Sequence, residues 1–321
     1  MPRNARLDVP NILQHVMARG IEDQKIFRNK KDREEFLRRL SDVVTKGKVQ
    51  LFGWCLMSNH FHLLLRPREM TLATMMRRLM TGYAVWHNRR YARKGHLFQN
   101  RYKSIVVEED SYFLELVRYI HLNPVRAGMM SRLSELNRYP YSGHAVIMGY
   151  RDYGCQDVGG VLEWFGSRAG EARRGYRNFI EAGFDQGERE DLQGGGLIRS
   201  AGGREALARR RKDEREIGDE RILGSGSFVE EILNTQTEPR TRKDGNLGDI
   251  LDEVCEQSGI SRKQLLSRSR IHKVSRARRV FFLRAHEESG ESLTALGRLC
   301  GLAHTSVREA IQRAREERDN H

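Results

Sequence analysis

The sequence lacks the features that mark several protein classes. Its four cysteines, at positions 55, 155, 255 and 300, lie far apart, so no close pair indicates a zinc ribbon or a disulfide scaffold, and we expect reduced thiols. No stretch approaches the roughly 20 apolar residues of a membrane helix, and the first residues lack the apolar core of a signal peptide. The nucleotide-binding pattern GxxxxGK[ST] does not occur. We therefore expect a soluble, cytoplasmic protein without an ATPase site or a membrane partner.

Positive charge, in contrast, is abundant. The 321 residues carry a formal net charge of +14, which favours nucleic acid over a membrane surface as the partner. Ten lysines and arginines lie between Arg66 and Lys103 against the single Glu69, and eight lie between Ser261 and Arg279 against no acidic residue. A solvated basic face is the plainer explanation of such runs, but acidic residues would then be interspersed. The sequence thus predicts two separate basic patches.

Hydrophobic periodicity predicts an α+β fold. Residues 11–67 have the pattern of a strand, a helix and a second strand, and residues 71–92 have the pattern of an amphipathic helix. Residues 104–107 suit a strand. The helix that follows them should end at Asn123-Pro124. This order is typical of a ferredoxin-like antiparallel sheet with helices. The predicted domains are residues 1–130 with this sheet, a helical extension over 131–185, a glycine-rich and charged linker over 186–245 with a short helix near 228–233, and an all-α domain over 246–321.

Two histidines are candidates for metal ligands. His60 and His62 lie in the segment SNHFHLLL, and on a strand residues i and i+2 share a face, so both imidazoles can reach one ion. A His-x-His pair also arises by chance, and hydrogen-bonded histidines at a sheet edge would explain it equally well.

A tyrosine and an asparagine form a second candidate group. Tyr119 and Asn123 in RYIHLNPV are four residues apart on a predicted helix and so lie on one face. The tyrosine hydroxyl is a poor nucleophile at neutral pH unless a cation helps it. The amide oxygen of Asn123 could complete a site with the two histidines that suits Mg²⁺ or Mn²⁺. An ordinary half-buried tyrosine is the competing explanation, and Tyr112 and Tyr102 are rival nucleophiles.

The combination of motifs resembles one family. The segments GWCLMSNHFHLLL, GHLFQNRYKS and YIHLNPVRAG, supported by QHVMARGIEDQKIF and RYPYSGHA, occur in the order found in the REP-associated tyrosine transposases, which are single-tyrosine HUH endonucleases. The resemblance covers about residues 1–185. It implies a ferredoxin-like nuclease that nicks single-stranded DNA next to a hairpin.

The resemblance also assigns roles to residues. It makes His60 and His62 the metal ligands and Tyr119 the nucleophile, which would form a 5′-phosphotyrosine and release a 3′-hydroxyl. Asn123 would be the third ligand, although related transposases usually have glutamine there. Basic residues expected to hold DNA phosphates are Arg77, Arg78, Arg89, Arg90, Arg101 and Lys103.

The C-terminal region predicts a helix-turn-helix. The segment SLTALGRLCGLAHTSVREAIQRARE has a short helix, a turn at Gly301 and a second helix whose first residues can enter a major groove. Residues 249–315 resemble the DNA-binding domain of the replication initiator DnaA through VSRARRV and AHTSV. Ala303 stands where that family usually has aspartate, and a partner-binding helical module is the competing explanation. The DNA contacts that the resemblance implies are Arg276, Arg278, His304, Thr305 and Ser306.

The sequence therefore predicts a transposase-type endonuclease that nicks and rejoins single-stranded DNA at hairpins, with a C-terminal domain for duplex DNA. We expect a monomer, with a dimer as the alternative. A hairpin-binding or duplex-binding regulator without catalysis is the main rival function, and a zinc hydrolase that uses water is a third.

Overall fold

A computed structural model of the chain describes residues 7, 9–187, 189, 192, 218–237, 246–269, 271–289, 291 and 293–319. The chain divides into two compact units, Met1–Thr237 and Glu238–His321. In the described part of the chain, every helix is too short or too polar to span a membrane.

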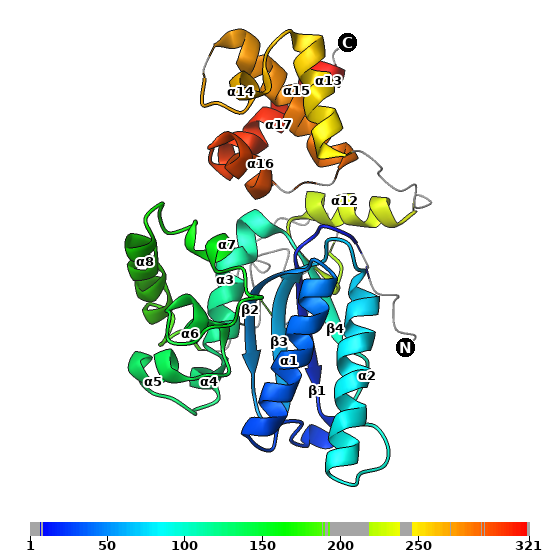
Figure 1. Ribbon diagram of the computed structural model, residues 1–321, viewed down its shortest axis with the longest axis vertical. Coiled ribbons are helices and arrows are strands. Elements are labelled where there is room, and N and C mark those ends of the chain that lie inside the picture. Colours follow the sequence, from blue (N-terminus) through cyan, green and yellow to red (C-terminus); the bar gives the residue numbers. More distant parts are fainter. Residues whose placement is uncertain are drawn as a thin grey trace, which may run out of the picture. The chain divides into compact units, whose positions relative to one another are not determined.

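The sheet of the first unit has the predicted ferredoxin-like arrangement. Over the described residues it has five strands in the order β2-β3-β1-β4-β5. Strand β1 pairs antiparallel with β3 on one side and with β4 on the other, and β2 pairs antiparallel with β3 (Figure 1). The first elements along the chain are β1 (Gln14–Arg19), a 3-10 helix (Ile21–Asp23), α1 (Lys30–Lys46), β2 (Gln50–Leu56), β3 (His60–Arg66), α2 (Leu72–Arg90) and β4 (Lys103–Val107).

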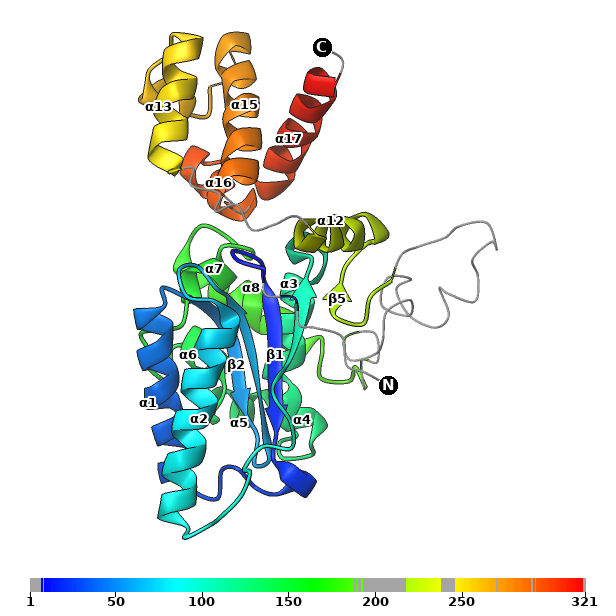
Figure 2. The ribbon, with the colours of Figure 1, turned by 90° about the vertical axis from the view of Figure 1, so that its right-hand side faces the viewer.

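Helices α1 and α2 cover one face of this sheet, as Figure 2 shows. Helix α1 begins at a capping box in which the Asn29 side chain accepts from the Asp32 backbone and the Asp32 carboxylate accepts from the Asn29 backbone. Its apolar residues follow the helical repeat and are buried. From β3, alternate residues Phe61, Leu63 and Leu65 enter this core.

Helix α3 (Glu109–His121) and a group of short helices cover the opposite face. Leu64 of β3 packs in this second core, so the strand alternation turns His60 and His62 toward α3 as well. These short helices lie beside α3 in Figure 1, and all but the first fall within the predicted helical extension, residues 131–185. They are α4 (Asn123–Arg126), α5 (Leu133–Arg138), α6 (Gly143–Ile147), α7 (Val158–Leu162) and α8 (Ala169–Glu181).

A segment far along the chain completes the sheet edge. Strand β5 (Ile222–Leu223) pairs parallel with Val106 and Val107 of β4, and α12 (Gly226–Thr237) follows it. Leu7, Val9, Val106, Ile222, Val229 and Ile232 form a small separate core there. Helix α12 includes the residues 228–233 for which a short helix is predicted, and its Val229 and Ile232 pack in this small core.

The second unit is helical, as predicted. Its elements are α13 (Leu247–Ser258), α14 (Arg262–Leu265), α15 (His272–Glu288), α16 (Leu293–Cys300) and α17 (His304–Asp319). Phe281 and Phe282 of α15 are fully buried at the centre of its core. The turn between α16 and α17 passes through Gly301 at φ +64°, a left-handed conformation that glycine adopts without strain. This short turn joins the two helices of the predicted helix-turn-helix.

Candidate active site

The strand β3 places His60 and His62 next to each other on the sheet face that α3 covers. His60 stands opposite Arg19 of β1, and His62 stands opposite Met17. The two imidazole centroids are 5.2 Å apart, with the rings nearly perpendicular. Both rings therefore lie on one face at a spacing that allows them to share a ligand.

Each of these imidazoles has a hydrogen-bond partner at Nδ1. The His60 Nδ1 lies 2.7 Å from the Asn59 side-chain oxygen, and the His62 Nδ1 lies 2.9 Å from Nε2 of His15. Because Nδ1 is engaged, Nε2 is the nitrogen that each ring can offer to a metal ion.

The surroundings keep both rings neutral at physiological pH. Burial, aided by the Arg19 charge, lowers the pKa of His60 to about 4. Burial also lowers the pKa of His62 well below its usual range, with smaller effects from His15, His60 and nearby arginines. A neutral imidazole is the form that binds metals.

Tyr119 of α3 lies against these histidines. Its side chain is buried, and its ring centroid is 5.9 Å from those of both His62 and His15, edge-on to each. The Arg126 guanidinium lies 4.8 Å from the centroid of the Tyr119 ring, and it donates a hydrogen bond to the Tyr119 carbonyl. Burial lowers the pKa of Arg126, while the neighbouring Tyr119 opposes that shift. A cation and two imidazoles thus surround the tyrosine ring.

Asn123 begins α4 and is half-buried. Its amide nitrogen donates to the carbonyls of Tyr119 and Ile120, which leaves the amide oxygen as the group able to bind a metal. Among the described residues, no group of three or more His, Cys, Asp or Glu side chains is arranged to hold a metal ion. An amide oxygen is also a ligand that Mg²⁺ and Mn²⁺ accept, so Asn123 remains the proposed third ligand.

The two rival tyrosines have different surroundings. Tyr102 is buried in the core beneath α1 and α2, on the other side of the sheet from His60 and His62. Tyr112 lies two turns before Tyr119 on α3 and packs at the margin of the second core. The ring of Tyr119 contacts His62 directly.

In the second unit, Arg276 and Arg278 differ sharply. Arg276 is exposed on α15. Arg278 is buried and donates to the carbonyls of Leu265, Ser267 and Ser269, so it holds the loop after α14. These bonds use three of its five N–H donors inside the protein, so a DNA contact from Arg278 stays a prediction that its burial does not favour. Ser306 is exposed at the start of α17, whereas the side chains of His304 and Thr305 lie outside the described residues.

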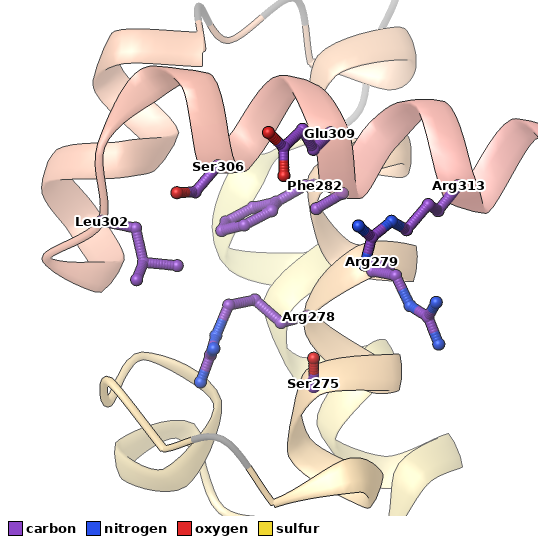
Figure 3. Close-up of a pocket in the computed structure, with 9 residues that line it drawn as sticks. Ser275, Arg278, Arg279, Phe282, Leu302, Ser306, Glu309 and Arg313 are labelled. Carbon is purple, nitrogen blue, oxygen red and sulfur yellow. The ribbon is translucent and has the colours of Figure 1, made fainter.

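A pocket of about 170 Å³ lies between α15 and α17. Figure 3 shows Arg279 and Arg313 on one side of it and Ser306 near Leu302 on the other, with Arg278 extending toward the loop. Three arginines against one acidic residue, Glu309, give this pocket a positive lining beside the first turns of α17.

Comparison with protein-family models gives two matches. Residues 8–123 match the family described as "Transposase IS200 like". The first unit resembles the IS200-like transposases. Residues 247–314 match the family described as "Bacterial dnaA protein helix-turn-helix". We refer to Met1–Thr237 as the transposase-like unit and to Glu238–His321 as the dnaA-like unit.

Beyond these family matches, the likeness to known proteins is to solved structures. No curated protein matches the chain. Among solved structures, a REP-associated tyrosine transposase bound to a REP hairpin matches with a TM-score of 0.37 and 14% sequence identity, covering 49% of this chain and 98% of that chain.

The predicted phosphate contacts of the transposase-like unit fall into two groups. Arg77, Arg78, Arg89 and Arg90 are exposed on α2, across the sheet from Tyr119, and Arg90 pairs with Asp32. Lys103 stands opposite Met17, so it shares the face of His62, and the exposed Arg101 comes two residues earlier. The structure thus brings Lys103 near the site and places the α2 arginines away from it.

Sequence reasoning missed four residues of this site: His15, Arg19, Asn59 and Arg126. Asn59 and Arg126 are themselves residues of the quoted segments, SNHFH and NPVRAG, which is a usable signal. His15 and Arg19 lie in the quoted segment QHVMARGIEDQKIF, but their place beside His60 and His62 follows from the pairing of β1 with β3.

Proposed function

We propose that the chain nicks and rejoins single-stranded DNA at hairpins through a covalent tyrosine intermediate. The observation that carries the proposal is the position of Tyr119, whose ring lies edge-on to His62 and under the Arg126 guanidinium. The match to IS200-like transposases supports a DNA transposase, and the sequence resemblance to REP-associated tyrosine transposases supplies the hairpin substrate.

In the proposed reaction the Tyr119 phenol oxygen attacks the phosphorus of one phosphodiester. A bond forms between that oxygen and phosphorus, the bond from phosphorus to the 3′ oxygen breaks, and the leaving oxygen takes up a proton to become a 3′-hydroxyl. The phenol proton passes to solvent. The products are a 5′-phosphotyrosine and a free 3′-hydroxyl, and attack by a 3′-hydroxyl reverses the step and rejoins a strand.

The chain's own residues would orient this step. Arg126, over the Tyr119 ring, would stabilise negative charge on the phenol, and Arg19 and Lys103 would attract the DNA backbone to the same face. His60, His62 and the Asn123 amide oxygen would hold a divalent metal, Mg²⁺ or Mn²⁺, which when bound polarises the phosphate.

The dnaA-like unit would bind duplex DNA near the cleaved strand. Its match to a helix-turn-helix family supports this role, with exposed contacts from Arg276 and Ser306. His304 and Thr305 remain proposed contacts through the sequence resemblance.

The test is incubation of the full chain with labelled single-stranded hairpins from the flanks of its gene, with Mn²⁺ or Mg²⁺, followed by denaturing electrophoresis. Wild type should give a metal-dependent band that resists denaturation, and Tyr119→Phe should abolish it. Tyr112→Phe is the matched control on the same helix and should retain the band. Cleavage that survives Tyr119→Phe would overturn the assignment, and binding without cleavage would favour a DNA-binding regulator.

A further inference from the structure

His15 lies at the centre of the sheet, beside a proposed metal ligand. It belongs to β1, which is paired on both sides, and its side chain is fully buried. His15 stands opposite Leu64, which places it diagonally next to His62 on the same face. The two rings stack, with centroids 5.2 Å apart and planes inclined by 23°. This packing fixes the orientation of the His62 ring.

The hydrogen bond between the two rings has a chemical consequence. Nε2 of His15 lies 2.9 Å from Nδ1 of His62, so one nitrogen carries the proton and the other accepts it. If Nδ1 of His62 donates, Nε2 of His62 carries a lone pair and can bind a metal. If Nδ1 accepts, a neutral His62 holds its proton on Nε2, where it blocks that position.

We propose that His15 is a positioning residue that accepts a hydrogen bond from Nδ1 of His62 and so presents Nε2 of His62 to the metal ion. This inference rests on the proposed function, because it assigns a metal to His62. His15 then carries its own proton on Nδ1.

The neighbouring ligand has the same arrangement with a different partner. Nδ1 of His60 lies 2.7 Å from the side-chain oxygen of Asn59, and an amide oxygen only accepts. His60 therefore has its proton on Nδ1 and its lone pair on Nε2. If His62 also carries its proton on Nδ1, both imidazoles offer the lone pair of Nε2 to a shared ion.

The test reads the His62 tautomer directly and needs no DNA. Nitrogen-15 spectra of metal-free, histidine-labelled full-length protein distinguish the two neutral tautomers, and His62→Gln identifies the signals. His62 should be protonated on Nδ1 in wild type. His15→Phe keeps a ring in the core but removes the acceptor, and it should give mixed tautomers and a Kd for Mn²⁺ about 10- to 100-fold higher in calorimetric titration. His15→Gln places an amide oxygen near the position of Nε2 and should restore most of the affinity.

The outcomes separate this inference from the proposed function. A wild-type His62 protonated on Nε2 would overturn the role of His15, and that measurement holds even if His15→Phe fails to fold. Equal Mn²⁺ affinity in wild type and folded His15→Phe would also overturn it while leaving the proposed nuclease intact. Failure of wild type to bind Mn²⁺ would instead remove the metal site itself, and the positioning role with it.

Discussion

At the scale of single residues, a cation lies beside the proposed nucleophile, Tyr119 of α3. Arg126 contacts both the ring and the carbonyl of Tyr119. A planar guanidinium in a partly buried place stabilises developing negative charge more strongly than it would in water. Its removal should therefore affect the chemical step more than the fold.

We predict that Arg126→Gln slows formation of the protein–DNA adduct by roughly 10- to 1000-fold. The free energy of unfolding should change by only about 1 to 2 kcal/mol, because one carbonyl loses a donor. Single-turnover gels and urea denaturation measure the two effects. Arg138→Gln, an exposed arginine on α5, is the control and should leave the rate unchanged. A wild-type rate in Arg126→Gln would exclude a role in the reaction.

Two arginines of the dnaA-like unit give a matched comparison. Arg278→Ala leaves three loop carbonyls without their donor, so this unit should lose about 2 to 4 kcal/mol of unfolding free energy. Arg276→Ala should lower the free energy of unfolding by less than about 0.5 kcal/mol but weaken the binding of duplex DNA. Urea denaturation, followed by circular dichroism, measures the stability of each variant. A fluorescence anisotropy titration with duplex DNA measures its binding. Equal stability losses in the two variants would contradict this division.

At the scale of elements, a buried polar network joins the tyrosine helix to the helical extension. The Tyr176 hydroxyl of α8 lies 2.8 Å from Nδ1 of His121 on α3 and 2.9 Å from Nδ1 of His144 on α6. Nε2 of His144 lies 2.8 Å from the Asn137 side-chain oxygen. Four separate helices, α3, α5, α6 and α8, are therefore tied together two residues beyond Tyr119.

This network predicts acid sensitivity. Burial lowers the pKa of His144 to about 3, far below the roughly 6.5 of an unfolded histidine. Between these values the unfolded chain binds a proton that the folded chain does not, so stability falls as pH falls below about 6.5. The slope is up to about 1.4 kcal/mol per pH unit for this group.

The measurement is urea denaturation at pH 7, 6 and 5, followed by tryptophan fluorescence. All three tryptophans, Trp54, Trp86 and Trp164, lie in the transposase-like unit, so the signal reports that unit alone. His144→Gln should be less stable at pH 7 but show a shallower fall with acid. An unchanged slope in the variant would mean that other groups dominate the acid response.

Whether a feature can be predicted from the sequence depends on whether it arises from residues close together along the chain. The i, i+2 spacing of His60 and His62 and the i, i+4 spacing of Tyr119 and Asn123 are local, and the antiparallel fold followed from periodicity. The segment that contains His15 was part of the family resemblance, but the position of His15 beside His62 depends on strand register across the sheet. Arg276 and Arg278 look alike in one basic run, and only the tertiary fold buries the second. Strand β5 has two residues, too few to show any alternation.

At the scale of the whole molecule, the two units should act separately. Each has its own core, and the proposed catalytic residues all belong to the transposase-like unit. We predict that residues 1–237 alone form the adduct with hairpin DNA and that residues 238–321 alone bind duplex DNA. With about four phosphate contacts, the duplex Kd should rise roughly 150-fold between about 50 and 200 mM salt.

Gel assays on the separate units and anisotropy titrations at several salt concentrations provide the check. Arg276→Ala should reduce the slope of log Kd against the logarithm of salt concentration by the amount expected for about one phosphate contact. Loss of nicking by residues 1–237 would show that the dnaA-like unit is required for the chemistry.

Strand β5 also governs when the transposase-like unit can finish folding during synthesis. The ribosome makes Val106 long before Ile222, its partner at the edge of the sheet. Until residues 222–237 have left the exit tunnel, the backbone of β4 stays open on that side and Val106 lacks its apolar cover. The nascent chain is then most exposed to aggregation and to chaperones, and a message cut short before codon 222 would yield a protein with its sheet edge bare.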